Sequence, residues 1–157
     1  MRALVTGGCG FIGSNLVKRL VQTGWIVDIV DDMSSGTLDL LSDLPEDVKI
    51  RPVPSASFLG AYEDSEAENR SQKDIMILQD DFACPEMLDR ISRTNMYDIV
   101  FHQAAIPRVL YSVQNPAITT NVNISKTTAL FEACIGSVSR IVFASSSSVY
   151  GGSDILP

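Results

Sequence analysis

The chain has 157 residues, of which 45% are hydrophobic and 20% charged, and its formal net charge is −7. This length and balance are typical of one globular domain. The acidic charge and the scattered Lys and Arg residues argue against a nucleic-acid partner, and no apolar run is long enough to span a membrane. Because the start of the chain lacks a signal peptide's basic segment and cleavage site, we expect a cytoplasmic protein.

Short apolar segments alternate with helical patterns along the chain. Strands are expected at residues 2–6, 26–31, 75–79, 98–102 and 140–145, and helices at 11–23, 36–43, 85–94 and about 116–135. Apolar strands that alternate with helices predict an α/β fold, a doubly wound parallel sheet of the Rossmann type with strand order 3-2-1-4-5. Residues 54–73 are polar and aperiodic, so we expect an insertion that is disordered or, alternatively, a small excursion near a binding site.

The first turn carries the stretch VTGGCGFIGS, in which GxxGxxG follows a strand and opens a helix. Gly7 would permit the tight turn, Gly10 would let the backbone approach a pyrophosphate, and Gly13 would let the helix pack closely. The free amides around Phe11 and Ile12 would then meet the negative charge of the phosphates. The pattern therefore predicts a dinucleotide site.

An acid follows at the position expected for a ribose contact. Asp31 ends the second strand, eighteen residues after Gly13. Its carboxylate could accept hydrogen bonds from both ribose hydroxyls and would repel a 2′-phosphate, which favours NAD over NADP. The alternative is that Asp31 caps the turn before MSSG. We interpret Asp32 as a capping or solvent-facing group.

The cysteines indicate no metal site. Cys9, Cys84 and Cys134 form neither a CxxC pair nor a zinc spacing, so we interpret them as reduced thiols. Cys9 lies inside the glycine loop, where a small filler is a simpler interpretation than a nucleophile.

Several motifs together resemble the extended branch of the short-chain dehydrogenase/reductase superfamily, the nucleotide-sugar epimerases and dehydratases. MRALVTGGCGFIGSNLV is similar to its glycine loop, VDDMSSG (30–36) to its ribose- and adenine-side loop, and QDDF (79–82) to its adenine contact. HQAAIP (102–107) resembles the loop under the cofactor, and FASSSSVYG (143–151) the strand that carries the catalytic serine or threonine. The resemblance implies these cofactor-binding residues: Gly7, Gly10, Phe11, Ile12, Gly13, Asp31, Asp32, Ser34, Ser35, Gly36, Asp81, Phe82, Gln103, Ala104, Ala105 and Asn123.

In that family a tyrosinate takes the proton of the sugar 4-hydroxyl while hydride passes to NAD, and hydride then returns to the opposite face. The resemblance places Ser146 as the catalytic serine, although a serine run that merely ends a strand is the alternative. Asn123 matches the Asn of the family's active-site helix, and Lys126 stands where the family often has glycine. His102, the only histidine, is expected to be structural.

The family's YxxxK pair does not occur in this sequence. The residues four positions after the tyrosines are Glu66, Phe101, Asn115 and Asp154. In the family the pair follows the serine motif at a distance that lies beyond Pro157. We therefore interpret residues 1–157 as the N-terminal, NAD-binding portion of a longer enzyme, without its substrate-binding part. An exposed apolar sheet edge and a risk of self-association would result.

Among the family's activities, 4-epimerisation of UDP-hexoses or their N-acetyl forms is favoured, because AAIPRVLYSVQNP and SSSSVYG look most like that subgroup. A dehydratase would carry Asp-Glu after its catalytic Thr, where this chain has Ser147 and Ser148. A UDP-glucuronate decarboxylase stays open, and so does a non-catalytic NAD-binding module. The expected partner is a nucleotide sugar, and the full-length form is expected to be a homodimer.

Overall fold

The computed structural model describes residues 1–53 and 74–151; the predicted insertion at 54–73 lies outside this part of the chain. Its centre is a six-stranded parallel sheet in the order β3-β4-β2-β1-β5-β6. The strands are β1 (Arg2–Thr6), β2 (Ile26–Val30), β3 (Ile50–Val53), β4 (Ile75–Leu78), β5 (Ile99–His102) and β6 (Arg140–Phe143). The predicted fold class and the order of the five predicted strands are confirmed, and β3 is an additional edge strand.

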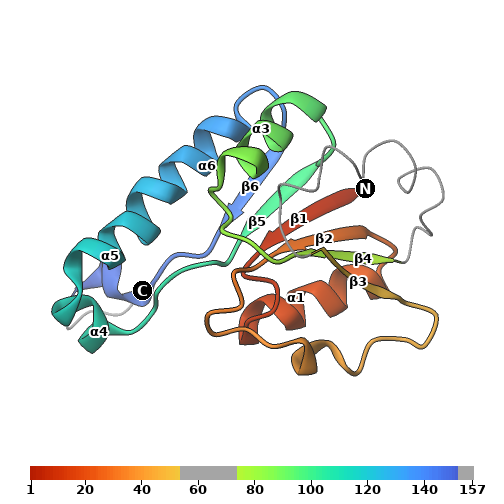
Figure 1. Ribbon diagram of the computed structural model, residues 1–157, viewed down its shortest axis with the longest axis horizontal. Coiled ribbons are helices and arrows are strands. Elements are labelled where there is room, and N and C mark those ends of the chain that lie inside the picture. The colour runs from red at the N-terminus through yellow and green to blue at the C-terminus, as the bar shows by residue number, and fades with distance from the viewer. Residues whose placement is uncertain (54–73, 152–157) are drawn as a thin grey trace.

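Helices cover the sheet on both faces, as Figure 1 shows: α1 (Phe11–Gln22) lies against one face, and α3 (Pro85–Thr94) and α6 (Thr127–Cys134) lie against the other. The helical elements are α1 (Phe11–Gln22), η1 (Leu38–Leu41), α3 (Pro85–Thr94), α4 (Val109–Gln114), α5 (Pro116–Thr120), η3 (Asn121–Lys126), α6 (Thr127–Cys134) and η4 (Ser147–Tyr150). The predicted helices at 11–23 and 85–94 are confirmed, whereas the one at 36–43 is a single 3-10 turn. The long helix predicted at 116–135 is present as α5, the π-helical η3 and α6 in succession.

The core has two layers because successive residues of a strand point to opposite faces. In β1, Ala3 and Val5 pack toward α1, whereas Leu4 packs toward α3 and α6. All three side chains are fully buried. This double burial explains why the strands are continuous apolar runs in the sequence rather than alternating ones.

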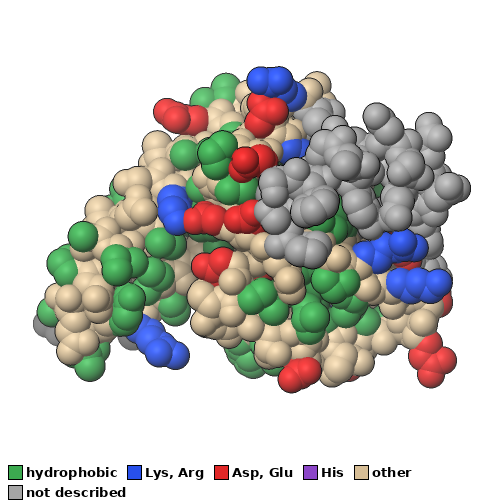
Figure 2. All heavy atoms as spheres, in the orientation of Figure 1, with side chains coloured by type: hydrophobic (Ala, Val, Ile, Leu, Met, Phe, Trp, Pro, Cys, Tyr) green, Lys and Arg blue, Asp and Glu red, His purple; other side chains and the backbone are tan. Residues whose placement is uncertain are grey.

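The β6 side of the sheet is open within the described residues. Val142 and Phe143 keep 39% and 51% of their surface exposed, and α4 exposes Val109, Leu110 and Val113. The predicted exposed apolar edge is confirmed, while self-association through it stays a prediction. On the face seen in Figure 2, basic and acidic side chains are dispersed among apolar ones. Among the described helices, none is long and apolar enough to cross a bilayer.

Candidate functional site

The glycine loop lies between β1 and α1, at the edge where the parallel strands end (Figure 1). Gly7 has φ +67°, a left-handed conformation that favours glycine. Its amide donates to Val30 O at 2.9 Å, and its carbonyl accepts from Gly10 N at 3.1 Å. These two hydrogen bonds turn the chain sharply out of β1 and into α1, as the sequence predicted for Gly7.

Close backbone contacts surround the loop. A Cβ on Gly7 would lie 2.8 Å from Ala104 N, and one on Gly13 would lie 2.1 Å from Gly7 O. A side chain at position 13 would therefore collide with the residues that directly follow β1, so glycine lets α1 start close to the end of this strand. A Cβ on Gly10 would meet only Gly7 O, at 3.3 Å, so the protein's own packing leaves the space beside Gly10 open.

The first turn of α1 presents amides without a side-chain cap. Gly10 is the N-cap in an extended conformation and provides no side-chain cap for the amides of the first turn. The side chains of Phe11 and Ile12 are 77% and 66% exposed, so they do not cover this end. Backbone amides that have no intrahelical acceptor and lie at the positive end of a helix can bind a diphosphate.

Asp31 follows β2 and is already engaged with the glycine loop. Its Oδ2 accepts from Cys9 N and its Oδ1 from Met33 N, both at 2.9 Å, and only 7% of the residue is exposed. Burial raises the pKa of this carboxyl, and the two amide hydrogen bonds oppose that rise. Asp31 thus ties β2 to the glycine loop, a role that the sequence analysis missed. Each oxygen retains acceptor capacity for a ribose hydroxyl.

Cys9 fills space beneath this connection. It is fully buried, and burial and then the charge of Asp31 raise the pKa of its thiol to about 12. A buried thiol held in that state is a poor nucleophile, which supports the interpretation of Cys9 as a filler. A Cβ on Gly36 would lie 2.8 Å from Cys9 Cβ, which accounts for glycine at that position.

The loop after Asp31 is a short polar turn. Asp32 Oδ1 accepts from Ser34 N at 2.9 Å and from the Ser34 hydroxyl at 2.6 Å. Asp32, Ser34 and Ser35 are exposed beside the site, so Asp32 is the capping group that the sequence indicated.

The two residues predicted to contact the adenine differ in how far they are buried. Asp81 is half-buried, its Oδ1 accepts from Ala83 N at 2.9 Å, and its Oδ2 is ion-paired with Lys126. Phe82, in contrast, is only 6% exposed, and its ring centroid lies 4.9 Å from that of His102. The Phe82 side chain is therefore part of the core, so a contact with a ligand would have to come from its backbone.

The loop after β5 lies against the glycine loop through Ala104. The amides of Gln103 and Ala104 donate to the hydroxyl of Thr6, at 3.2 and 3.1 Å, and Ala105 is exposed beyond them. Asn123, on η3, holds the backbone of Ile106, the residue that follows Ala105. It accepts from Ile106 N at 2.8 Å and donates to Ile106 O at 3.0 Å.

Ser146 lies beyond β6, on the same edge of the sheet. Its Oγ accepts from Ser148 N at 3.2 Å and caps η4, and the residue is exposed. A hydroxyl oxygen that accepts an amide still carries its own proton, so Ser146 can donate a hydrogen bond to a ligand.

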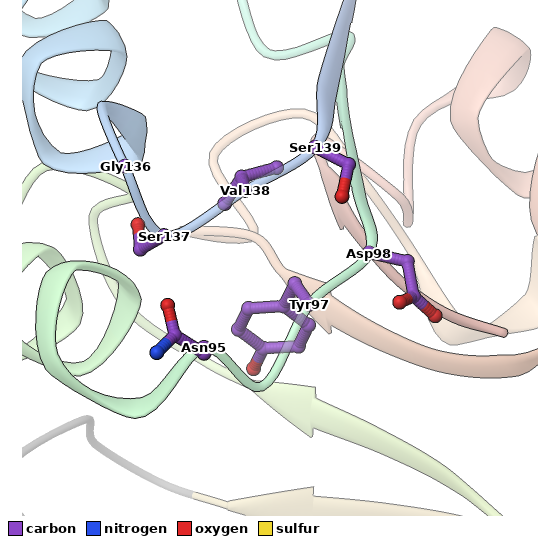
Figure 3. Close-up of a pocket in the computed structure, with 7 residues that line it drawn as sticks. All are labelled: Asn95, Tyr97, Asp98, Gly136, Ser137, Val138 and Ser139. Carbon is purple, nitrogen blue, oxygen red and sulfur yellow. The ribbon is translucent and has the colours of Figure 1, made fainter.

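A hollow lies at the opposite end of the strands from the glycine loop, where α3 leads into β5 and α6 into β6 (Figure 3). Tyr97 and Asp98 line it together with residues 136–139. Tyr97 is 2% exposed, and Asp98 Oδ2 accepts from Arg2 N at 2.7 Å. These groups already have structural partners, and the hollow is remote from the glycine loop.

A doubly wound parallel sheet with an uncapped, glycine-lined helix start and an acid after β2 is the architecture typical of dinucleotide-binding domains. The model of the NAD dependent epimerase/dehydratase family matches residues 3–157, and the chain belongs to this family. NAD is thus the family's cofactor. The predicted relationship and cofactor are confirmed.

Two curated relatives illustrate the range of activities. The chain is 29% identical, over 96% of its length, to a UDP-N-acetyl-alpha-D-glucosaminuronate decarboxylase of Bacillus cytotoxicus. It is 31% identical, over 99% of its length, to a UDP-glucose 4-epimerase of Neisseria meningitidis serogroup C. It spans only 38% and 40% of the lengths of these two proteins.

A solved structure agrees with this relationship. The UDP-glucose-4-epimerase of Stenotrophomonas maltophila, with bound NAD and formylated UDP-arabinopyranose, superimposes with a TM-score of 0.72 at 29% identity. The match covers 100% of this chain and 40% of that protein.

Proposed function

We propose that this chain is the NAD-binding part of an enzyme that inverts a UDP-sugar at carbon 4. The observation that carries the proposal is the open space beside Gly10, at the uncapped start of α1. The protein's own packing does not need a glycine at this position, so binding of a ligand is the reason left for it. Residues 1–157 would form one NAD-binding domain with an insertion at 54–73, and the substrate-binding part of the enzyme would lie in a further region.

The residues of the site fit NAD chemically. The amides of Phe11 and Ile12 would hold the diphosphate at the start of α1, and the free lone pairs of Asp31 would accept the ribose hydroxyls. Asp81 would face the adenine, and the peptides of residues 103–105 would lie along the cofactor. Bound NAD supplies the reversible hydride acceptor that no protein side chain can provide.

Ser146 would orient the sugar. Its exposed hydroxyl, fixed by the Ser148 amide, would donate a hydrogen bond to the reacting sugar oxygen and hold that oxygen in place. Removal of the hydroxyl proton of the sugar needs a base with a lowered pKa, because a free phenol has a pKa of about 10. We propose that such a base comes from a part of the enzyme outside residues 1–157.

Two observations bear on the choice of reaction. The positions after Ser146 are Ser147 and Ser148, whose hydroxyls cannot act as the carboxylic acid and base that dehydration requires. Epimerisation is therefore favoured over dehydration. Decarboxylation of a UDP-hexuronate is the second candidate, supported by the Bacillus cytotoxicus relative. We also propose a cytoplasmic location and a homodimer for the complete enzyme.

The test has two parts. Calorimetry on this chain should give saturable binding of NAD and of ADP-ribose; no binding of either would refute the cofactor site. The complete enzyme should then be given UDP-glucose, UDP-N-acetylglucosamine and UDP-glucuronate. Interconversion at carbon 4 supports the epimerase, release of CO₂ supports the decarboxylase, and NAD binding without turnover indicates a non-catalytic module.

Ser146→Ala in the complete enzyme should lower kcat by about a hundredfold or more and leave NAD affinity within about twofold. Ser147→Ala is the matched control and should change neither quantity. If Ser147→Ala instead lowered kcat, the catalytic hydroxyl would be assigned to the wrong serine.

A further inference from the structure

His102 lies at the carboxyl end of β5, in hydrogen-bond contact with a threonine on each side. Its Nδ1 is 2.6 Å from Thr6 Oγ1 on β1, and its Nε2 is 2.9 Å from Thr127 Oγ1 on α6. The exposed fractions of Thr6, His102 and Thr127 are 0%, 1% and 6%. The three side chains therefore form a buried chain of hydrogen bonds that crosses from β1 to α6.

The donors and acceptors of this chain can be assigned by counting. A threonine hydroxyl has one proton to donate and two lone pairs. The amides of Gln103 and Ala104 both donate to Thr6 Oγ1, and the Gln103 amide shares its proton with Thr6 O at 3.1 Å. The hydroxyl proton of Thr6 then needs an acceptor, and His102 Nδ1 is the one that the described residues offer. Nδ1 is consequently unprotonated, and Nε2–H donates to Thr127.

We infer that His102 is a positioning residue for the loop at 103–105, because its neutral Nε2–H form accepts the Thr6 proton and thereby leaves the Thr6 oxygen to the Gln103 and Ala104 amides. The other tautomer would point an N–H at the Thr6 hydroxyl and leave the hydroxyl proton without a buried acceptor. A buried group left without its hydrogen bond is costly. The tautomer of His102 and the position of this loop are therefore linked.

The surroundings keep the ring neutral. Three aromatic rings contact the imidazole: Phe143 stacks on it at 5.7 Å between centroids, and Phe82 and Phe131 lie at 4.9 and 6.0 Å. Burial lowers the pKa of His102 from 6.5 to about 4, so the ring is uncharged at neutral pH. A charged ring would carry a proton on Nδ1 and could not accept from Thr6.

The consequence for binding, which depends on the proposed NAD site, arises at Gly7. The backbone of Ala104 lies so close to Gly7 that a Cβ there would be 2.8 Å from Ala104 N and 2.9 Å from Ala104 Cα. Thr6 immediately precedes Gly7 in the chain. The hydrogen bonds that the amides of residues 103 and 104 donate to the Thr6 hydroxyl therefore hold this loop in a fixed position relative to the glycine loop. His102 orients the hydroxyl that accepts them.

Nitrogen-15 NMR of this chain tests the tautomer directly, because its spectrum contains the signals of a single histidine. Long-range proton–nitrogen correlations at pH 7 should show an unprotonated Nδ1 and a protonated Nε2. A protonated Nδ1, or an equal mixture of tautomers, would overturn the inference. This measurement needs no ligand and no substitution, so it is independent of whether NAD binds.

Thr6→Val and Thr6→Ser form a matched pair, since valine keeps the shape of threonine and serine keeps its hydroxyl. In Thr6→Val the amide proton of Ala104 should exchange with solvent about tenfold faster than in Thr6→Ser, and NAD affinity should fall about tenfold. Thr6→Ser should stay within about threefold of the unmodified chain in both. Equal exchange at Ala104 in the two variants would overturn the positioning role. Absence of NAD binding by the unmodified chain would instead refute the proposed function, while the tautomer measurement and the exchange comparison together would still decide the role of His102.

Discussion

Gly10→Ala should separate cofactor binding from folding. Gly10 has φ −79° and ψ 173°, which alanine adopts freely, and the nearest atom to a new Cβ is Gly7 O at 3.3 Å. The loss of a good N-cap is offset by reduced freedom of the unfolded chain, so the free energy of unfolding should change by about 1 kcal/mol or less. The methyl group would occupy the space proposed for the diphosphate. A steric overlap there costs about 1–3 kcal/mol, or roughly five- to 150-fold in NAD affinity.

Gly13→Ala is the control with the opposite expectation. Its Cβ would lie 2.1 Å from Gly7 O and 2.8 Å from Gly8 Cα, and backbone atoms cannot move aside cheaply. The free energy of unfolding should fall by about 2 kcal/mol or more, beyond what the higher helix propensity of alanine restores. Urea denaturation measures stability, and calorimetry measures NAD affinity. Unchanged affinity in Gly10→Ala would refute the diphosphate site, and equal stability of the two variants would refute the steric argument.

Three further substitutions test individual side chains. Asp31→Ala should lower NAD affinity by roughly 1.5–3 kcal/mol, and full affinity in calorimetry would exclude the ribose role. The free energy of unfolding should also fall by about 2 kcal/mol, because the buried amide of Cys9 and the partly buried amide of Met33 lose their acceptor. His102 has a depressed pKa, so its contribution to stability is complete above pH 6.5 and is lost as the pH falls through 4. In urea denaturation, the free energy of unfolding of the unmodified chain should fall by about 3 kcal/mol more than that of His102→Asn between pH 7 and 4. Equal losses in the two proteins would contradict the assigned pKa. A double-mutant cycle of Lys126→Met and Asp81→Asn should give a coupling free energy of about 0.2–1 kcal/mol in the stability of the chain. Both side chains are about one-third exposed, so this coupling should weaken as salt is added. A coupling that salt does not change would argue against an ion pair.

The sheet was largely predictable because its signals are local. Five apolar runs separated by helical patterns indicated a parallel sheet, and the order of those strands is the predicted one. The edge strand β3 was missed because Arg51 and Pro52 interrupt its apolar run. Proline lacks an amide proton, but an edge strand pairs on one side only and tolerates it. The helix α4 was missed because Val109, Leu110 and Val113 are exposed and produce no core-facing pattern.

The segments that form the candidate site could be predicted to lie close together, but their contacts could not. The glycine spacing and the acid after β2 correctly indicated the carboxyl ends of the strands as the place where these residues meet. Three contacts could not be predicted: the hydrogen bond from Cys9 N to Asp31, the packing of Phe82 against His102, and the ion pair of Lys126 with Asp81. Each of these contacts joins residues that are 20 or more positions apart in the chain. No local spacing encodes such a pairing.

The order of residues in one strand–turn–helix unit is enough to specify where a dinucleotide could bind, because backbone conformation and helix polarity act over a few neighbouring positions. Which hydroxyl donates and which accepts was decided only when β1, β5 and α6 packed together. Thr6 and Ala104 are 98 positions apart, yet their hydrogen bond of 3.1 Å sets the geometry beside Gly7. Parallel strands end at one edge, so distant segments meet there, and burial then requires that every donor find an acceptor.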